Sequence, residues 1–388
     1  MASSFVAALA LGQIILIEYV ESSLFVLGIT GSFLNILLFA QRKFRSNSCC
    51  TSLGQIILIE YVESSLFVLG ITGSFLNILL FAQRKFRSNS CCTYLLASAV
   101  AALVLILMAI IPQLYALNHI PSSLFNGNFC KAQGYITQVS AMLCRWLLTI
   151  ACIDRCLLTS TNASLRLFAT VHIAKKIILL LHIIWLIFPI HMLLFADVRR
   201  IGYITCMLST DSSALYHSIY SIIAGGFLPT FIMSICAKYI WKNLQLKRQR
   251  RGMINLQRRQ NKREIRNIQI LIMLLLQVII FVLFTFPYMS FNLYLTFTRS
   301  VTNKSTDRLA IESFMQLFTG ATVLVHPAIS FYLNTMVSQT YRNELIILFR
   351  KFIVCDQRQR FHRGQRVAPN TIFAITDRRN ALPMTVIN

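Results

Sequence analysis

Seven long apolar segments constrain the fold of this chain more than any other feature of its sequence. A helix rises 1.5 Å per residue and needs about 20 predominantly apolar residues to cross a bilayer. The chain is 56% hydrophobic and 13% charged, whereas a soluble domain carries about 25% charged residues. The sequence therefore predicts an all-α membrane protein, a bundle of seven transmembrane helices. The expected spans are residues 64–82, 94–117, 131–155, 175–196, 217–240, 267–297 and 311–335.

The basic residues lie between the apolar segments and not on a polar domain. The formal net charge of +24 would fit nucleic acid on a soluble domain, but this distribution excludes that partner. With residue 63 outside, the inner segments 84–87, 155–176, 242–266 and 342–379 hold 26 of the 37 Lys and Arg residues, and the outer ones hold six. Cytoplasmic loops carry such an excess. We therefore expect a multi-pass plasma-membrane protein with its N-terminus outside and its C-terminus in the cytoplasm. The charge serves topology alone, or also attracts anionic lipid and an acidic cytoplasmic partner.

The N-terminal part contains an undrifted repeat, since residues 11–51 and 53–93 are identical. Two consecutive spans run antiparallel, so using both copies would place one QRKFR sequence outside, against the charge bias. We expect the first copy, within residues 1–52, to be an accessory segment or an artefact. Residues 53–336 then form the bundle, and residues 337–388 form a short amphipathic cytoplasmic helix with a basic tail.

Short motifs recur at matching places along the spans. Cys130 begins the third span and Asp154-Arg155-Cys156 ends it; the 25 residues from Cys130 to Arg155 span about 37 Å as a helix, one membrane crossing. This order resembles the rhodopsin-like (family A) G-protein-coupled receptors over about residues 60–355, and SFYLNTMVSQTYRNEL resembles invertebrate FMRFamide-type peptide receptors. The structural markers that carry the resemblance in the other spans are Asn77, Trp185, Pro229, Pro287, His326 and Pro327.

The resemblance implies a receptor that passes an extracellular ligand signal, from a peptide, to a heterotrimeric G protein. It implies no enzyme activity, no cofactor and no metal. A secondary transporter or channel is the alternative from another class, but no acid lies at mid-membrane depth. A decayed, non-signalling receptor is a further alternative. Its motivation is the set of departures from the family pattern, which are Cys156, Thr285, His326 and Ser330.

Two arginines of the third span attract separate hypotheses. By the resemblance to the receptor family, Asp154 holds Arg155 in the resting state. Activation then frees Arg155 to bind the partner, a role that suits the rigid five-donor fork of its guanidinium. The alternative is a basic stop signal at the membrane edge. Arg145 lies ten residues earlier, about 15 Å deeper, where a charge is costly unless it faces a polar interior. It is either a polar hub replacing the acid that many family members carry at Ala102, or a packing residue that snorkels through a water-filled core.

The ligand pocket is expected in the outer halves of spans three, five, six and seven. Thr137 occupies the position where amine receptors carry an Asp, so a cationic amine would lack its counter-ion. A polar, aromatic, wide-mouthed pocket suits a peptide, although each residue could equally make an interhelical contact. The candidates are Tyr135, Thr137, Gln138, Met142, Ser221, Tyr288, Asn292, Glu312 and Gln316.

Three covalent features are expected at the membrane surfaces. Cys130 and Cys206 would both face the oxidising side, where a disulfide would tie the loop after span four to span three; the alternative is two free thiols. Asn303 begins an Asn-Lys-Ser glycosylation acceptor in an outer loop, used or unused. Cys355 follows the amphipathic helix and is a palmitoylation candidate or a free thiol.

Overall fold

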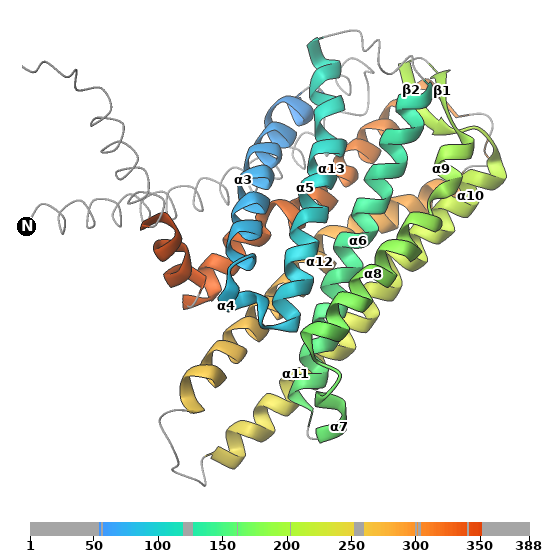
Figure 1. Cartoon of the computed structure of the whole chain (residues 1–388). Helices are drawn as coiled ribbons and strands as arrows, with labels where there is room; N and C mark the ends of the chain where they lie inside the picture. The colour runs from blue at the N-terminus through green and yellow to red at the C-terminus, as the bar shows by residue number, and fades with distance from the viewer. Residues whose placement is uncertain are drawn as a thin grey trace, which may run out of the picture. The chain divides into compact units, whose positions relative to one another are not determined.

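A computed structural model of the chain forms the predicted bundle of seven transmembrane helices (Figure 1). It describes residues 54–55, 57–118, 127–160, 162–201, 203–251, 260–298, 301, 304–339 and 341–350. The seven helices long and apolar enough to cross a membrane are Leu58–Phe81, Ser90–Tyr115, Gly127–Thr159, Val171–Phe195, Ser212–Ile240, Ile272–Phe297 and Thr306–Val337. Each overlaps one of the seven spans expected from the sequence, so that expectation is confirmed.

Several spans consist of more than one element. The π-helix η1 precedes α3 in the first span, α8 and α9 make the fourth, and α10, the π-helix η3 and α11 make the fifth. The bounds are η1 Leu58–Glu63, α3 Ser64–Phe81, α4 Arg84–Arg87, α5 Ser90–Asn118, α6 Gly127–Thr159, α7 Ala163–Arg166, α8 Val171–Ile187, α9 Ile190–Phe195, α10 Asp211–Tyr220, η3 Ser221–Phe227, α11 Leu228–Arg251, α12 Gln260–Phe297 and α13 Thr306–Val337.

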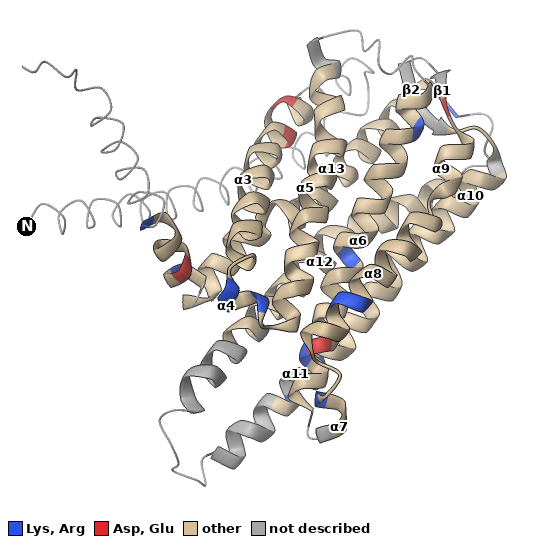
Figure 2. Cartoon of the chain, viewed as in Figure 1, with Lys and Arg blue, Asp and Glu red and all other residues tan. Residues whose placement is uncertain are grey.

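Helix α6 is the central element of the bundle. It contacts α5, α8, α9, η3 and α11, and 67% of its most apolar window is buried, against 22% for the α8–α9 span. Charged residues lie mostly toward the helix ends, with long uncharged stretches between them (Figure 2). A residue placed on α6 therefore meets several other spans at once, whereas α8 presents most of its surface to lipid.

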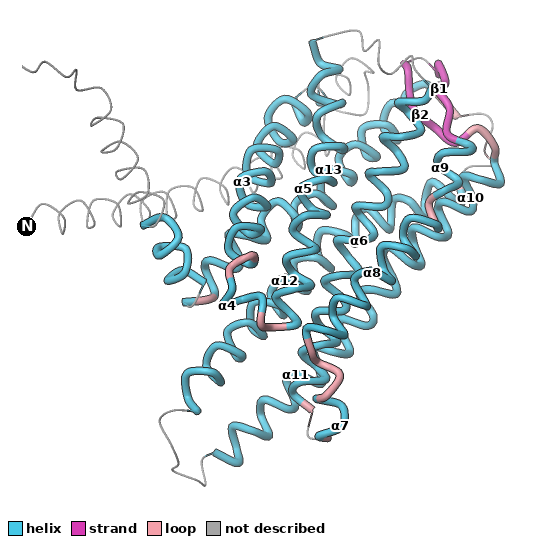
Figure 3. The backbone as a smooth tube through the Cα atoms, in the orientation of Figure 1, coloured by secondary structure: helices cyan, strands magenta, loops and turns pink. Residues whose placement is uncertain are grey.

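A two-stranded antiparallel hairpin follows the fourth span (Figure 3). It consists of β1 Ala196–Ile201 and β2 Tyr203–Leu208, with Val198 paired to Cys206. Both strands contact α6. The hairpin thus brings the loop between spans four and five against the third span.

Some sequence expectations fall outside what the structure describes. They include the first repeat copy within residues 1–52, the acceptor Asn303 and Cys355. The backbone of Cys206 is described as part of β2, but its side chain is not. Arg342–Asn388 is a separate compact unit, and its described residues 342–350 are helical.

Candidate functional site

The acidic and basic pair Asp154 and Arg155 of the third span forms a buried network at the end of α6. Arg155 donates to Asp154 Oδ2 from Nε at 3.0 Å and from Nη2 at 2.5 Å. Nη2 also donates to Asn89 Oδ1 at 2.8 Å and to Ser90 Oγ at 3.2 Å, and Ser90 Oγ donates to Asp154 Oδ2 at 2.9 Å. We call Asp154, Arg155, Asn89 and Ser90 the Arg155 network. It joins the last turns of α6 to the first turn of α5.

The Arg155 network is shielded from solvent, and one guanidinium nitrogen of Arg155 has no acceptor. Arg155 is 2% exposed and Asp154 is 5% exposed, so the charges are neutralised by each other and not by water. Breaking such a buried pair by removing one partner costs about 3–5 kcal/mol. The Nη1 group of Arg155 is buried with no hydrogen-bond partner, which leaves a cationic donor available for a new acceptor.

Arg145 meets the backbone of the fifth span. Its Nη1 donates to the carbonyl oxygen of Gly225 at 3.2 Å, and the neighbouring Trp146 Nε1 donates to the carbonyl of Ala224 at 2.8 Å. Both carbonyls lie in the π-helix η3, four and five residues before Pro229. Proline has no N–H, so it cannot donate to either the i−4 carbonyl of an α-helix or the i−5 carbonyl of a π-helix. Pro229 therefore removes one backbone donor, and Arg145 and Trp146 donate to the two carbonyls that its N–H could have reached.

Glycine gives Arg145 a close approach to the fifth span. A Cβ added at Gly225 would lie 2.6 Å from Arg145 Nη1 and 2.8 Å from Met142 Cε. A Cβ at Gly226 would lie 2.6 Å from the sulfur of Met289. The Gly225-Gly226 pair thus lets α6 and α12 pack directly against the backbone of η3. Sequence reasoning offered a polar hub or a snorkelling packing residue for Arg145, and did not anticipate a carbonyl freed by Pro229.

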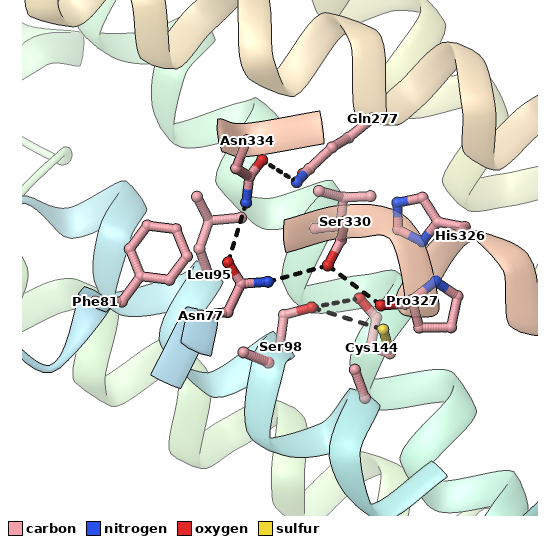
Figure 4. A pocket seen from close by; sticks show the side chains of 13 residues that line it. Asn77, Phe81, Leu95, Ser98, Cys144, Gln277, His326, Pro327, Ser330 and Asn334 are labelled. Carbon is pink, nitrogen blue, oxygen red and sulfur yellow. Dashed lines mark hydrogen bonds between the residues drawn. The ribbon is translucent and has the colours of Figure 1, made fainter. Parts of the chain in front are cut away.

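A chain of amides links the first, sixth and seventh spans (Figure 4). Gln277 Nε2 donates to Asn334 Oδ1 at 2.7 Å, Asn334 Nδ2 donates to Asn77 Oδ1 at 3.4 Å, and Asn77 Nδ2 donates to Ser330 Oγ at 3.1 Å. The Tyr341 hydroxyl also donates to Asn77 Oδ1. Burial raises the pKa of Tyr341, so its hydroxyl keeps the proton that it donates. Asn77, predicted as a marker, therefore accepts from both Asn334 and Tyr341 and links the first span to the seventh span and to the segment after it.

A small cavity adjoins this chain of amides (Figure 4). It offers about 20 Å³ to water, enough for about one molecule. His326 lines it with a buried Nε2 that has no hydrogen-bond partner, and its ring meets Phe281 edge-on at 5.5 Å. Ala102 and Cys144 line the same cavity. The cavity therefore contains no carboxylate to bind a sodium ion, and one water would satisfy the open ring nitrogen.

Several pocket candidates make contacts between helices. Tyr135 donates its hydroxyl to the carbonyl of Leu186 at 2.7 Å, and Gln138 Nε2 donates to Ser221 Oγ at 3.2 Å. These contacts tie α6 to α8 and to η3. Thr137 Oγ1 is buried with no hydrogen-bond partner. The remaining candidates include Met142, which is fully buried, Tyr288 and Asn292, which are half-buried, and Gln316, which is exposed. None of the nine lines the cavity of Figure 4.

Glu312 belongs to a charged cluster at the start of α13. Lys304 Nζ donates to Glu312 Oε2 at 2.7 Å, and Arg308 Nε donates to Glu312 Oε1 at 3.0 Å. The Tyr294 hydroxyl of α12 donates to the same oxygen at 3.1 Å. We call these four residues the Glu312 cluster. Its single carboxylate lies against two cations, Lys304 and Arg308. A ligand group that reaches the cluster therefore meets a net positive charge.

The other markers occupy structural positions. Trp185 is buried in an aromatic group with Trp146, Phe188 and Tyr220, with ring centroids 5.6–6.3 Å apart. Pro229 is the second residue of α11, and Pro287 and Pro327 lie inside α12 and α13.

Cys130 is fully buried near the start of α6. Its pairing with Cys206 stays a prediction.

Two groups of residues escaped sequence reasoning. Asn89 immediately precedes α5 and Ser90 begins it, and such a short polar pair is typical of an ordinary helix start. His191 and His217 lie 26 residues apart on different elements and face each other at 3.0 Å. The spacing of Pro229 from two glycines was the one available signal for the Arg145 contact, because a proline always frees an upstream carbonyl inside a helix.

The comparison with protein families gives one match. The model of the 7 transmembrane receptor (rhodopsin family) matches residues 73–329, which is more than half of the 388-residue chain. The matched range includes the Arg155 network, Arg145 and the Glu312 cluster. No curated protein sequence matches the chain.

Proposed function

Because this chain belongs to the rhodopsin family of seven-transmembrane receptors, we propose that it passes the signal of an extracellular peptide to a heterotrimeric G protein. Membership makes it a multi-pass membrane protein that signals, and not an enzyme. The peptide class of the ligand, the G-protein partner and the outward N-terminus are the parts that we add.

The observation that carries the proposal is the Arg155 network. A cation that is buried, held by Asp154 and still has an unpaired Nη1 is suited to exchange one set of acceptors for another. Backbone carbonyls at the end of a partner helix are acceptors of the required kind, because the last four carbonyls of a helix have no intrahelical donor. Opening α5 from α6 would release Asn89 and Ser90, so that Asp154 would be the acceptor that a partner carbonyl joins or replaces.

We base the proposal of a peptide ligand on the charges at the opposite end of the bundle. Thr137 offers no counter-ion to a cationic amine, and the Glu312 carboxylate is already neutralised by Lys304 and Arg308. A ligand with several hydrogen-bonding groups suits such a site better than a single cation does. Basic residues of the Glu312 cluster would favour a carboxylate or acidic side chain on the ligand.

A disulfide between Cys130 and Cys206 would complete the outer face. The hairpin that carries Cys206 contacts α6, and Cys130 is buried near the start of that helix. A bridge would fix the hairpin as a lid beside the bundle mouth. Cys130→Ser should then reduce surface expression or ligand response in oxidising medium. Normal expression and response would argue for two free thiols.

The direct test is nucleotide exchange on G proteins in membranes that contain the full chain, during a screen of a peptide library. A peptide-dependent increase that Arg155→Ala abolishes, with peptide binding retained, would support the proposal. A peptide that binds without exchange on any G-protein class would indicate a non-signalling receptor. Surface labelling of a tag between residues 242 and 266 on intact cells would contradict the outward N-terminus.

A further inference from the structure

We propose that His191 and His217 form a zinc-binding site that joins the fourth and fifth spans. His191 lies on α9 and His217 lies on α10. Nε2 of His191 faces Nδ1 of His217 at 3.0 Å. This inference concerns a site apart from the Arg155 network and does not depend on coupling to a G protein.

The local backbone sets the protonation of His191. Pro189 interrupts the helix between α8 and α9, and the N–H of Met192 donates to the carbonyl of Pro189 at 2.9 Å. The carbonyl oxygen of Phe188, at the end of the interrupted helix, lies 3.2 Å from Nδ1 of His191. A carbonyl can only accept, so Nδ1 carries the proton and Nε2 of the neutral ring presents a lone pair toward His217.

This arrangement matches that of a histidine bound to a metal. Metal-ligating histidines almost always donate their second ring N–H to a carbonyl, carboxylate or water, which fixes the ring and the tautomer. Without metal, His217 donates its Nδ1 proton to His191. On binding zinc, the proton of His217 moves to its Nε2, both facing nitrogens present lone pairs, and the neutral pair releases no net proton.

The distance between the two nitrogens is close to what zinc requires. Zn–N bonds of about 2.0–2.1 Å at a tetrahedral angle separate two ligand nitrogens by about 3.3 Å. The present 3.0 Å separation would need to open by only about 0.3 Å, and the ring planes already differ by 49°. Among the described residues no group of three or more His, Cys, Asp or Glu side chains could hold a metal. Zinc would therefore have two protein ligands, with water at its other positions.

Aromatic rings surround the pair and limit how it can move. The Tyr216 ring lies 4.8 Å from that of His191, nearly perpendicular to it, and Tyr220 lies 5.9 Å from His191 and 6.1 Å from His217. His191 is 7% exposed and His217 is partly exposed. A ring that is held in place loses little freedom on binding a metal. His217 gives the ion access, and His191 anchors it to the fourth span.

The test is the unfolding temperature of the full chain in detergent micelles, with zinc chloride compared with EDTA. Wild type should show a saturable increase with zinc and none with magnesium, which prefers oxygen ligands. His191→Ala and His217→Ala should each weaken the apparent zinc affinity by roughly tenfold or more, the scale on which ligand-shell changes act. His182→Ala is the matched control, because His182 lies in the same span and bonds only the carbonyl of Ile178 in the described network. It should respond to zinc as wild type does.

A second probe covers the case in which the alanine variants fold poorly. His217→Asn keeps a polar side chain and should fold, yet lose the response to zinc. Cobalt added to wild type should give visible absorption bands of nitrogen ligation, and zinc should remove them. An unchanged wild-type unfolding temperature up to millimolar zinc would overturn the site. So would a response that persists in both His191→Ala and His217→Asn, since the metal would then bind elsewhere on the chain.

Discussion

Arg145 and Arg155 lie ten residues apart on α6, and both are buried, but the protein neutralises them in different ways. Arg155 faces an acid, an amide and a hydroxyl in the Arg155 network. Arg145 faces the carbonyl of Gly225 in a π-helix that a proline has interrupted. A pair between side chains can separate when two helices shift. The bond from Arg145 to the Gly225 carbonyl also joins two spans, but it satisfies an acceptor near Pro229, which has no N–H to donate.

The difference assigns the two arginines different functions. Arg155 has an alternative acceptor in any partner that reaches the end of α6, so we assign it to coupling. Arg145 closes a gap in the hydrogen bonding of the fifth span, so we assign it to holding α6 and η3 in register. This contact makes the polar-hub hypothesis more specific, because the acceptor of Arg145 is a backbone carbonyl and not an acid. A snorkelling Arg145 would have no need of Gly225.

The largest effect is expected for Arg145→Glu. A carboxylate at this place would face carbonyl oxygens, and an uncompensated buried charge costs about 3–5 kcal/mol. We expect little folded protein at the cell surface, measured by labelling and by the unfolding temperature. Arg145→Leu removes the charge along with the hydrogen bond and should fold about as well as wild type, with altered basal signalling. Equal surface levels of the two variants would contradict the assigned role.

A smaller effect is expected from crowding the same contact with Gly225→Ala. The new Cβ would meet Arg145 Nη1 at 2.6 Å and Met142 Cε at 2.8 Å, and overpacking costs about 1–3 kcal/mol. Gly320→Ala is the control, because a Cβ there meets nothing within 4 Å. It should be neutral or slightly stabilising, since Ala favours helix over Gly. Unfolding temperatures that rank the two variants in the opposite order would place Arg145 away from η3.

A double-mutant cycle tests whether Pro229 is the reason for Arg145. Pro229→Ala restores an N–H that can bond the carbonyl of Gly225 or Ala224, so Arg145→Leu, about neutral in wild type, should be stabilising in that background. We expect a coupling of about 1–2 kcal/mol between the two sites, within the range for groups in one network. Additive changes in the free energy of unfolding would show that Arg145 and Pro229 act independently.

The smallest effect is expected in the Arg155 network. Ser90→Ala removes one hydrogen bond to Asp154 and one to Arg155, each worth about 1 kcal/mol. Because Asp154 still holds Arg155, we expect a modest rise in basal nucleotide exchange with unchanged surface expression. Ser88→Ala is a suitable control, since Ser88 bonds only the carbonyl of Lys85 in the described network. A larger rise for Ser88→Ala would count against the assignment.

The sequence predicted the spans because an apolar run of fixed length has few other solutions in a membrane. It also identified Asp154, Arg155 and Arg145, since charges at the edge and within a span are rare. It could not predict their partners. Asn89 lies in the connector between the first two spans, and the Gly225 carbonyl has no side chain that a motif could include. The His191–His217 contact depends on how α9 turns after Pro189, which apolar patterning does not determine.

The proposed coupling to a G protein requires that Asp154 holds Arg155 at rest and that Arg155 contacts the partner on activation. The measurement is basal nucleotide exchange on a G protein by Asp154→Asn and by Asp154→Asn with Arg155→Ala, in membranes at matched expression. Asp154→Asn removes the charge that holds Arg155, so exchange should rise several-fold without ligand, and the second substitution should return it to background. Equal exchange by the single and double variants, or no rise with Asp154→Asn, would contradict the account.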